Sequence, residues 1–280
     1  MARLLACSLV VLAAGCCRRS GDTPEPVGRA ASQHADPLFT GAVDEATFAS
    51  LHEHTDAAAP RRFGETVRAG AAVFYRSLPT RTGPHPGVVV IHEWWGLNAH
   101  IEHWADRLAA LGYAALAVDL YGGRTATTPE GAMELVGSVD EDEARATLAA
   151  AVAYLEANGS ERIAVLGWCF GGGWALRAGV EVAGIDATIM YYGRPITEAA
   201  ALEGYGGPLL GVFGNEDTSI PPATVDAFAA ALTEAGVDHA LRRYDASHAF
   251  ANPSSARYDP VAAEAAWGEV QAFLRTHLAP

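Results

Sequence analysis

Short apolar segments alternate with helical periodicity through most of the chain, and this alternation restricts the fold more than any other feature of the sequence. From residue 66 onward, strand-like runs occupy Thr66–Leu78, Gly87–His92, Ala114–Asp119, Arg162–Gly167, Ala187–Tyr192, Leu209–Gly214 and His239–Tyr244. The runs at 88–91 and 163–166 are apolar at every position, as expected for parallel strands that helices cover on both faces. The sequence therefore predicts an α/β protein with a doubly wound, mostly parallel sheet.

Amphipathic helices fill the intervals between these strands. Each has apolar residues at three- and four-residue spacing, which places them in one stripe on the helix surface. The stripes are Ile101, Trp104, Leu108 and Leu111; Leu148, Val152 and Leu155; Val225, Phe228 and Leu232; and Trp267, Val270, Leu274 and Leu278. Because 50% of the 280 residues are hydrophobic, the chain can bury a large core.

The N-terminal residues have the pattern of an export signal. Arg3 precedes an apolar run from Leu4 to Gly15, which is shorter than the ~20 residues that a transmembrane helix needs but fits a secretory signal. The segment that ends at Cys16 resembles a bacterial lipobox, in which the cysteine is lipidated. We expect an exported protein, either periplasmic or anchored to a membrane through Cys16. A buried N-terminal helix is the alternative.

These features divide the chain into three parts. We expect residues 1–17 to be a signal peptide with a lipobox, residues 18–60 to be a proline-containing tether, and residues 61–280 to be the folded domain. Two cysteines besides Cys16 also fall in the first part, so Cys169 has no disulfide partner within the domain.

The charge of the chain argues against two classes of partner. With 19 Lys and Arg residues against 33 Asp and Glu residues, the formal net charge is −14. The resulting field repels nucleic acids and anionic membrane surfaces. We therefore expect a small-molecule substrate, no nucleic acid, and membrane contact only through the N-terminal lipid. The oligomeric state stays open.

Residues capable of nucleophilic chemistry stand where one of these strands meets a helix. Gly167, Cys169 and Gly171 form a G-x-C-x-G motif, which is the nucleophile-elbow pattern with Cys in place of Ser. The flanking glycines are needed because the tight turn leaves no room for a Cβ. The alternative is a small buried cysteine in a glycine-rich packing turn.

Two further residues at strand ends complete a candidate triad. Asp217 and then His248 follow Cys169 in the chain, which is the order of nucleophile, acid and histidine in the α/β-hydrolase fold. In such a triad the histidine removes the proton of the nucleophile, and the carboxylate fixes the histidine tautomer. Taken alone, Asp217 could be a turn residue or helix cap, and His248 a surface histidine.

With these residues in place, the sequence resembles the dienelactone hydrolase family, also called carboxymethylenebutenolidases, over roughly residues 62–278. The segments that carry the resemblance are His92–Asn98, Asp119–Gly122, Gly167–Gly172, Gly214–Asp217 and Ser247–Pro253. The resemblance implies an α/β-hydrolase fold, hydrolysis of an ester or lactone through a covalent acyl-enzyme, and triad roles for Cys169, Asp217 and His248. It also implies an oxyanion hole built from the backbone N–H groups of Trp94 and Phe170.

The resemblance assigns roles to further residues. Glu93 is expected to contact the nucleophilic cysteine and help it to ionise; a solvated carboxylate at a strand end is the alternative. Arg124, just after the Asp119–Gly122 segment, is expected to contact the substrate. Independently of the resemblance, Tyr121 is expected to line the pocket because it is an aromatic residue near a strand end. Asn252 stands where the family's second substrate-binding arginine is expected, and Arg257 is the candidate to replace it. This departure leaves the substrate open.

No cofactor is expected. The histidines at 92, 100 and 103 lack the companion ligands of a zinc site, and the glycines at 171–173 lack a dinucleotide-binding fingerprint. A thiol redox protein would need a second cysteine near Cys169. The stronger rival to an enzyme is a non-catalytic surface lipoprotein that keeps the fold for ligand binding.

Overall fold

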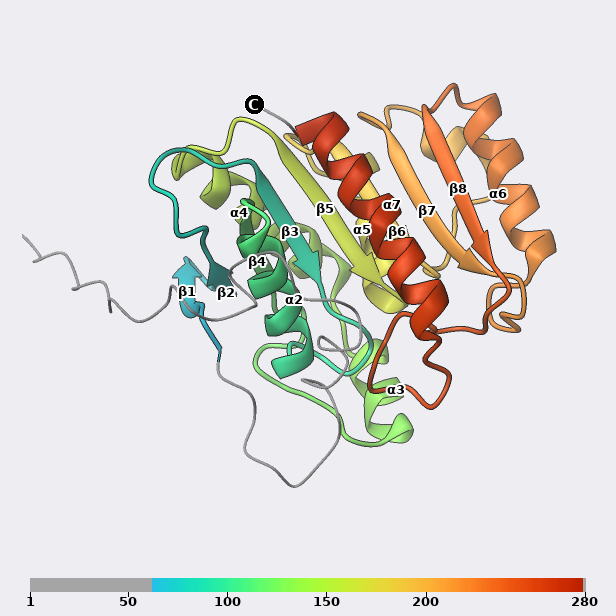
Figure 1. The fold of residues 1–280 in the computed structure, drawn as a ribbon, viewed down its shortest axis with the longest axis horizontal. Coiled ribbons are helices and arrows are strands. Elements are labelled where there is room, and N and C mark those ends of the chain that lie inside the picture. The colour runs from blue at the N-terminus through green and yellow to red at the C-terminus, as the bar shows by residue number, and fades with distance from the viewer. Residues whose placement is uncertain (1–61, 279–280) are drawn as a thin grey trace, which may run out of the picture. The chain divides into compact units, whose positions relative to one another are not determined.

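A computed structural model gives the structure of the protein and describes residues 62–278. The expected signal peptide, the Cys16 lipidation site and the tether all lie outside these residues. In the part that is described, eight strands form one sheet in the order β1-β2-β4-β3-β5-β6-β7-β8 (Figure 1). Helices cover both faces of the sheet, so the expected fold class is confirmed.

Six strands run parallel to one another and form the centre of the fold. They are β3 (Gly87–Ile91), β4 (Ala114–Val118), β5 (Ile163–Trp168), β6 (Ala187–Tyr191), β7 (Leu209–Gly214) and β8 (His239–Tyr244). The residues of β3, β4, β5, β6 and β7 are all buried, which explains their continuous apolar sequence. These strands agree with the sequence prediction to within about one residue at each end.

The first strand-like run differs from the prediction. Thr66–Leu78 was expected to form one run, but it contains two antiparallel strands, β1 (Glu65–Ala69) and β2 (Ala72–Ser77). Gly70, between them, has a φ of 61°, which a residue with a side chain rarely adopts. This glycine turn reverses the chain, and β2 then pairs antiparallel with β4.

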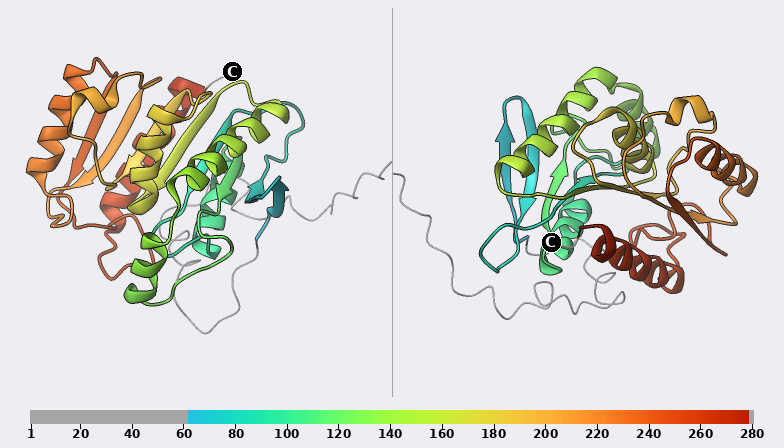
Figure 2. Two further views of the ribbon diagram at one scale, coloured as in Figure 1. Left: turned by 180° about the vertical axis from the view of Figure 1, so that it is seen from behind. Right: turned by 90° about the horizontal axis from the view of Figure 1, so that it is seen from above.

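Helices form a layer on each face of the sheet, as Figure 2 shows from two further directions. Buried side chains of α2 (Ala99–Ala110) and α7 (Pro260–Leu278) belong to one core layer. Those of α4 (Glu141–Ala157), α5 (Phe170–Glu181) and α6 (Pro222–Glu234) pack on the opposite face, together with the short helix η3 (Ala199–Leu202). No helix within residues 62–278 is both long and apolar enough to span a bilayer.

One helix that the periodicity did not predict is α3 (Pro129–Gly137). Thr128 caps its N-terminus, and Pro129 occupies the first turn, where its missing N–H costs no hydrogen bond. Only Ala132 and Leu135 of this helix are buried, too few to form a recognisable stripe. The helix lies below the carboxyl ends of the central strands (Figure 1).

Candidate active site

The turn after β5 holds Cys169 in a conformation that few non-glycine residues adopt. Its backbone has φ 52° and ψ −114°, and α5 begins at the next residue, Phe170. A Cβ on Gly167 would overlap the carbonyl of Gly171, and a Cβ on Gly171 would overlap the carbonyls of Ile91 and His92. The two glycines therefore permit the tight turn that presents the thiol at the sheet edge.

Three side chains form a continuous chain of contacts at this edge. Nε2 of His248 lies 3.2 Å from Sγ of Cys169, and Nδ1 of the same ring lies 2.7 Å from Oδ2 of Asp217. Because a carboxylate can only accept, Nδ1 carries the hydrogen, and Nε2 is left to accept from the thiol. This arrangement can remove a proton from sulfur and hold the resulting imidazolium.

Asp217 is fixed in position by more than the histidine. Its Oδ1 accepts hydrogen bonds from the backbone N–H groups of Ser219, at 2.7 Å, and Ile220, at 2.9 Å. Burial alone would raise the pKa of Asp217, but the hydrogen bonds from His248 and these N–H groups lower it below its ordinary value. The carboxylate therefore stays ionised beside His248.

Tyr192 supports the histidine from the end of β6. Its ring centroid lies 5.1 Å from that of His248 and 5.6 Å from that of Phe250. The residue is buried, yet it has a φ of 35°. A strained backbone of this kind persists only where the surrounding packing imposes it. The ring of Tyr192 is therefore held in place where it contacts the His248 ring.

The thiol is protonated in this state. Burial raises the pKa of Cys169 to about 12, and the nearby Glu93 carboxylate adds to the rise. Free cysteine has a pKa of about 8.5. His248 therefore lies next to the sulfur, while burial and the Glu93 carboxylate disfavour a thiolate before substrate binds.

Glu93 is buried at the end of β3, and its partner is an amide. Nδ2 of Asn252 donates a hydrogen bond to Oε2 of Glu93. Burial raises the pKa of Glu93 to about 7, although this hydrogen bond lowers it in part. A carboxyl group with a pKa close to neutrality can exchange a proton under ordinary conditions. Glu93 is therefore not the solvated carboxylate that was the alternative interpretation of its sequence position.

The two residues expected to form an oxyanion hole, Trp94 and Phe170, lie in the lining of the cleft around Cys169. The N–H of Phe170 is directed at Cys169, where it favours the ionised form of the thiol. Neither this group nor the N–H of Trp94 donates to a backbone carbonyl within the part of the chain that the structure describes.

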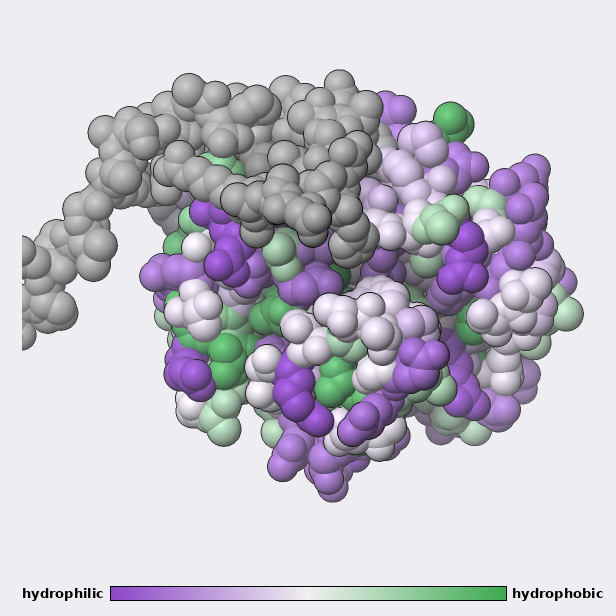
Figure 3. Space-filling view, turned by 90° about the horizontal axis from the view of Figure 1, so that it is seen from below, coloured by the Kyte–Doolittle hydropathy of each residue, from purple (hydrophilic) through white to green (hydrophobic). Residues whose placement is uncertain are grey.

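The cleft is large, with a volume of about 1930 Å³. Cys169, His248, Glu93 and Asn252 lie along its wall. Figure 3 views the molecule from the side on which the parallel strands end, and it shows apolar residues in recesses between hydrophilic ones. Most small-molecule sites measure roughly 300–1,000 Å³, so this cleft can accept a substrate of considerable size.

Of the three residues expected to bind substrate, one lines the cleft and two do not. Tyr121 is buried, its ring 5.4 Å from Phe170, and it does not line the cleft. The side chain of Arg124 is bound by the carbonyl of Tyr121 and by Oγ of Ser138, also outside the cleft. The structure therefore brings neither residue into the cleft, whereas Arg257 does line it.

His92, beside Glu93, has a structural role. Its Nδ1 contacts the Glu93 carbonyl at 2.6 Å, and its Nε2 accepts from the N–H of Leu120 at 3.2 Å. Burial lowers its pKa to about 4, so it is neutral. Within residues 62–278, no group of histidine, cysteine, aspartate and glutamate side chains is arranged to hold a metal ion.

The chain is similar to known proteins over almost the whole described region. It matches the model of the dienelactone hydrolase family over residues 73–278. A protein of Synechocystis sp. named as a candidate carboxymethylenebutenolidase is 33% identical, over 73% of this chain and 91% of that protein.

Solved structures agree with this. A candidate dienelactone hydrolase from Klebsiella pneumoniae has a TM-score of 0.68 at 27% identity, covering 74% of this chain and 93% of that one. A dienelactone hydrolase-like promiscuous phosphotriesterase from metagenomic libraries has a TM-score of 0.69 at 25% identity, covering 78% and 98% respectively.

Proposed function

The chain belongs to the dienelactone hydrolase family and is a carboxylic ester hydrolase, and we propose that it acts through a covalent thioester on Cys169. The observation that carries the proposal is the contact chain from Sγ of Cys169 through His248 to Asp217, at 3.2 Å and 2.7 Å. The rival expectation of a non-catalytic lipoprotein is set aside, because the family is one of enzymes.

In the proposed acylation, the carbonyl oxygen of the ester or lactone binds between the N–H groups of Trp94 and Phe170. Cys169 passes its thiol proton to His248, the sulfur attacks the carbonyl carbon, and the oxyanion is stabilised by the two N–H donors. When the intermediate collapses, the C–O bond breaks and His248 gives a proton to the departing oxygen. A thioester and an alcohol result; in a lactone they stay in one molecule.

Water completes the cycle. His248, neutral again, removes a proton from a water molecule, which attacks the thioester carbonyl. The C–S bond then breaks, and the sulfur recovers a proton as the carboxylic acid leaves. Asp217 keeps the imidazole oriented and stabilises its positive charge throughout, which its lowered pKa supports.

Glu93 is proposed to take part in ionising the thiol. With a pKa of about 7, its carboxylate can hold the thiol proton transiently when substrate excludes water from the cleft, before His248 takes that proton up. Before substrate binds, the high pKa of Cys169 keeps the sulfur protonated and protects it from oxidation, since oxidants attack the thiolate. Arg257 is the remaining candidate for holding an anionic group of a substrate at the rim.

Trapping the thioester tests this proposal. The enzyme is mixed with p-nitrophenyl acetate, quenched in acid, digested and mapped by mass spectrometry, and we expect the acetyl group on Cys169. Cys17 serves as an internal control for non-specific acylation. Cys169→Ala should show neither the modified peptide nor a burst of nitrophenol, and steady turnover by this variant would falsify the proposed mechanism.

We also propose that the protein is exported and lipidated on Cys16. The proposal rests on the N-terminal sequence alone. Mass spectrometry of the membrane fraction should find a mature chain that begins at a lipid-modified Cys16. A chain that retains Met1, or a soluble chain without lipid, would contradict it.

A further inference from the structure

The cleft around Cys169 continues onto an apolar surface formed around α3. This surface, here called the α3 wall, consists of Met133 and Val136 of α3 and Val139 just beyond it, all of which line the cleft. Met133 is 62% exposed, one of three large hydrophobic side chains that are exposed within the described residues. A flexible, exposed methionine on a cleft wall is well suited to contact an apolar ligand of variable shape.

Val139 of the α3 wall and the aromatic residues that contact His248 pack on different faces of the sheet. Val139 and Phe170 pack with the core layer beneath α4 and α5. Tyr192 and Phe250, which contact the histidine side of the site, belong to the layer beneath α2 and α7. Since His248 must reach the departing oxygen, the alcohol part of an ester lies on its side. The acyl part then points toward the α3 wall.

Three of the arginines near the α3 wall are already engaged in hydrogen bonds or ion pairs. Arg124 is held outside the cleft by the carbonyl of Tyr121 and by Ser138. Beyond Val139, Glu141 and Arg177 also line the cleft, but they pair with each other through two hydrogen bonds of 2.8 and 3.0 Å.

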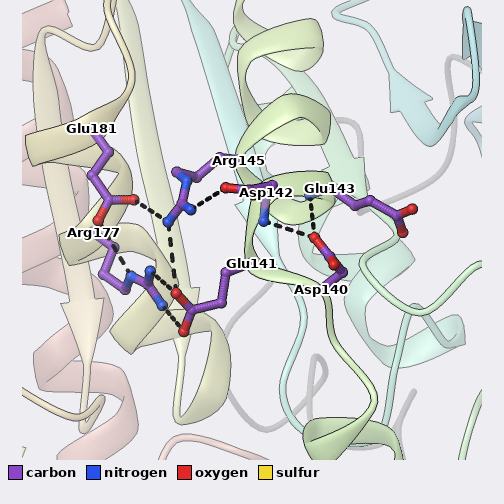
Figure 4. Close-up of polar contacts among 7 residues, drawn as sticks. All are labelled: Asp140, Glu141, Asp142, Glu143, Arg145, Arg177 and Glu181. Atoms are coloured by element: carbon purple, nitrogen blue, oxygen red, sulfur yellow. Dashed lines mark hydrogen bonds and ion pairs between the residues drawn. The ribbon is translucent and has the colours of Figure 1, made fainter.

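Figure 4 shows this pair within a larger ion network that includes Arg145 and Glu181. An anionic acyl group would therefore find no free cation among Arg124, Arg145 and Arg177, whereas an apolar group would cover Met133.

We propose that the enzyme is specific for esters or lactones with an extended apolar acyl group, which binds along the α3 wall. This inference rests on the proposed function, because it assigns one part of the substrate to each side of Cys169. The cleft volume of about 1930 Å³ leaves room for such a group.

Two series of esters test the proposal. In the first, p-nitrophenyl esters of acetate, butyrate, hexanoate and octanoate keep the leaving group constant and are used below their aggregation concentrations. Complete burial of one methylene of the acyl chain corresponds to about a fourfold gain in kcat/KM. We expect kcat/KM to rise at least about tenfold from acetate to octanoate, since the wall is open on one side. In the second series, ethyl and octyl acetate lengthen only the alcohol and should differ much less.

Substitution of the wall provides the matched comparison. Met133→Glu should lower the octanoate-to-acetate ratio of kcat/KM at least about fivefold, because it places a charge where the chain lies. Val261→Glu is the control, since Val261 is also an exposed apolar residue, at 77%, but lies on α7 away from the cleft lining. It should leave the ratio unchanged.

The outcomes separate this inference from the proposed mechanism. A flat acyl series in the wild type, a dependence on the alcohol chain instead, or an unchanged ratio in Met133→Glu would overturn the α3 wall as the acyl site. Turnover that survives in Cys169→Ala would overturn the proposed function itself, whatever the chain-length dependence.

Discussion

Asn252 donates a hydrogen bond from Nδ2 to Oε2 of Glu93, so that two buried side chains 159 residues apart in the chain meet in the cleft that Cys169 lines. The amide cannot turn freely, because its Oδ1 accepts from the N–H of Ser254 at 2.8 Å. A neutral donor lowers the pKa of a carboxyl group less than a cation does. The pairing therefore leaves the pKa of Glu93 at about 7, where it can change protonation during the reaction.

Removal of this donor should move the pH profile of the enzyme. Asn252→Ala takes away an interaction that lowers the pKa of Glu93, so the acidic limb of kcat/KM should shift to higher pH. Loss of one hydrogen bond to a charged carboxylate should shift the pKa of this limb by about one pH unit. Asn215→Ala is the control, because Asn215 bonds Asp245 outside the cleft. If the acidic limb had the same pKa in Asn252→Ala as in Asn215→Ala, a role for Glu93 in proton transfer would be contradicted.

Glu93→Gln should lose activity and gain stability above neutral pH. The pKa of Glu93 is raised in the folded state to about 7 from 4.5, so the folded protein binds more protons than the unfolded chain between these values. The free energy of unfolding therefore falls as pH rises through this window. Gln does not titrate, and the variant should exceed the wild type by about 2–3 kcal/mol at pH 8, less at pH 5. Urea unfolding at both pH values measures this; a constant difference would be inconsistent with it.

The sequence was sufficient to predict most of the sheet and the three residues that meet at its edge. The buried strands have continuous apolar runs. Cys169, Asp217 and His248 follow β5, β7 and β8, which run parallel, so their convergence follows from the parallel topology. The hairpin at Gly70 was missed because a single glycine interrupts the run, and α3 because so little of it is buried.

The remaining features of the site depend on contacts that leave no local trace in the sequence. Arg124 follows β4 as the resemblance led us to expect, but a carbonyl and the hydroxyl of Ser138 hold its side chain away from the cleft. The Asn252 to Glu93 hydrogen bond joins residues far apart in the chain. Neither spacing nor periodicity encodes such side-chain directions.

Cys169 should react slowly with alkylating agents in the resting enzyme. Its pKa of about 12 leaves far less thiolate at pH 7.5 than free cysteine has with a pKa of about 8.5. We expect iodoacetamide to modify Cys169 at least about a hundredfold more slowly than it modifies glutathione, and at a normal rate after unfolding in urea. Peptide mapping follows the reaction. Rapid modification of the folded enzyme at pH 7.5 would mean that the resting sulfur is ionised.

Asp217→Asn should retain a small part of the activity that Cys169→Ala and His248→Ala lose completely. The carboxylate orients His248 and stabilises its positive charge, whereas nucleophile and base act as one unit. We expect kcat to fall about 10³- to 10⁴-fold for Asp217→Asn. Glu216→Gln, at an exposed neighbouring carboxylate, is the control and should behave as wild type. If instead Asp217→Asn were as active as wild type, another carboxylate would have to orient the ring.

Gly167→Ala should destabilise the protein severely, because the elbow has no space for one more carbon. A Cβ at residue 167 would overlap the backbone carbonyl of Gly171, and neither neighbouring segment can withdraw, since one is β5 and the other begins α5. Loss of such a packed turn should cost about 3–5 kcal/mol, at the upper end of single-residue effects. Gly268→Ala is the matched control: Gly268 lies in α7, with nothing within 4 Å of the added carbon, and the change should stabilise the helix by about 0.5–1 kcal/mol. Thermal unfolding of both variants gives the comparison, and equal melting temperatures would show that the elbow can relax around a side chain.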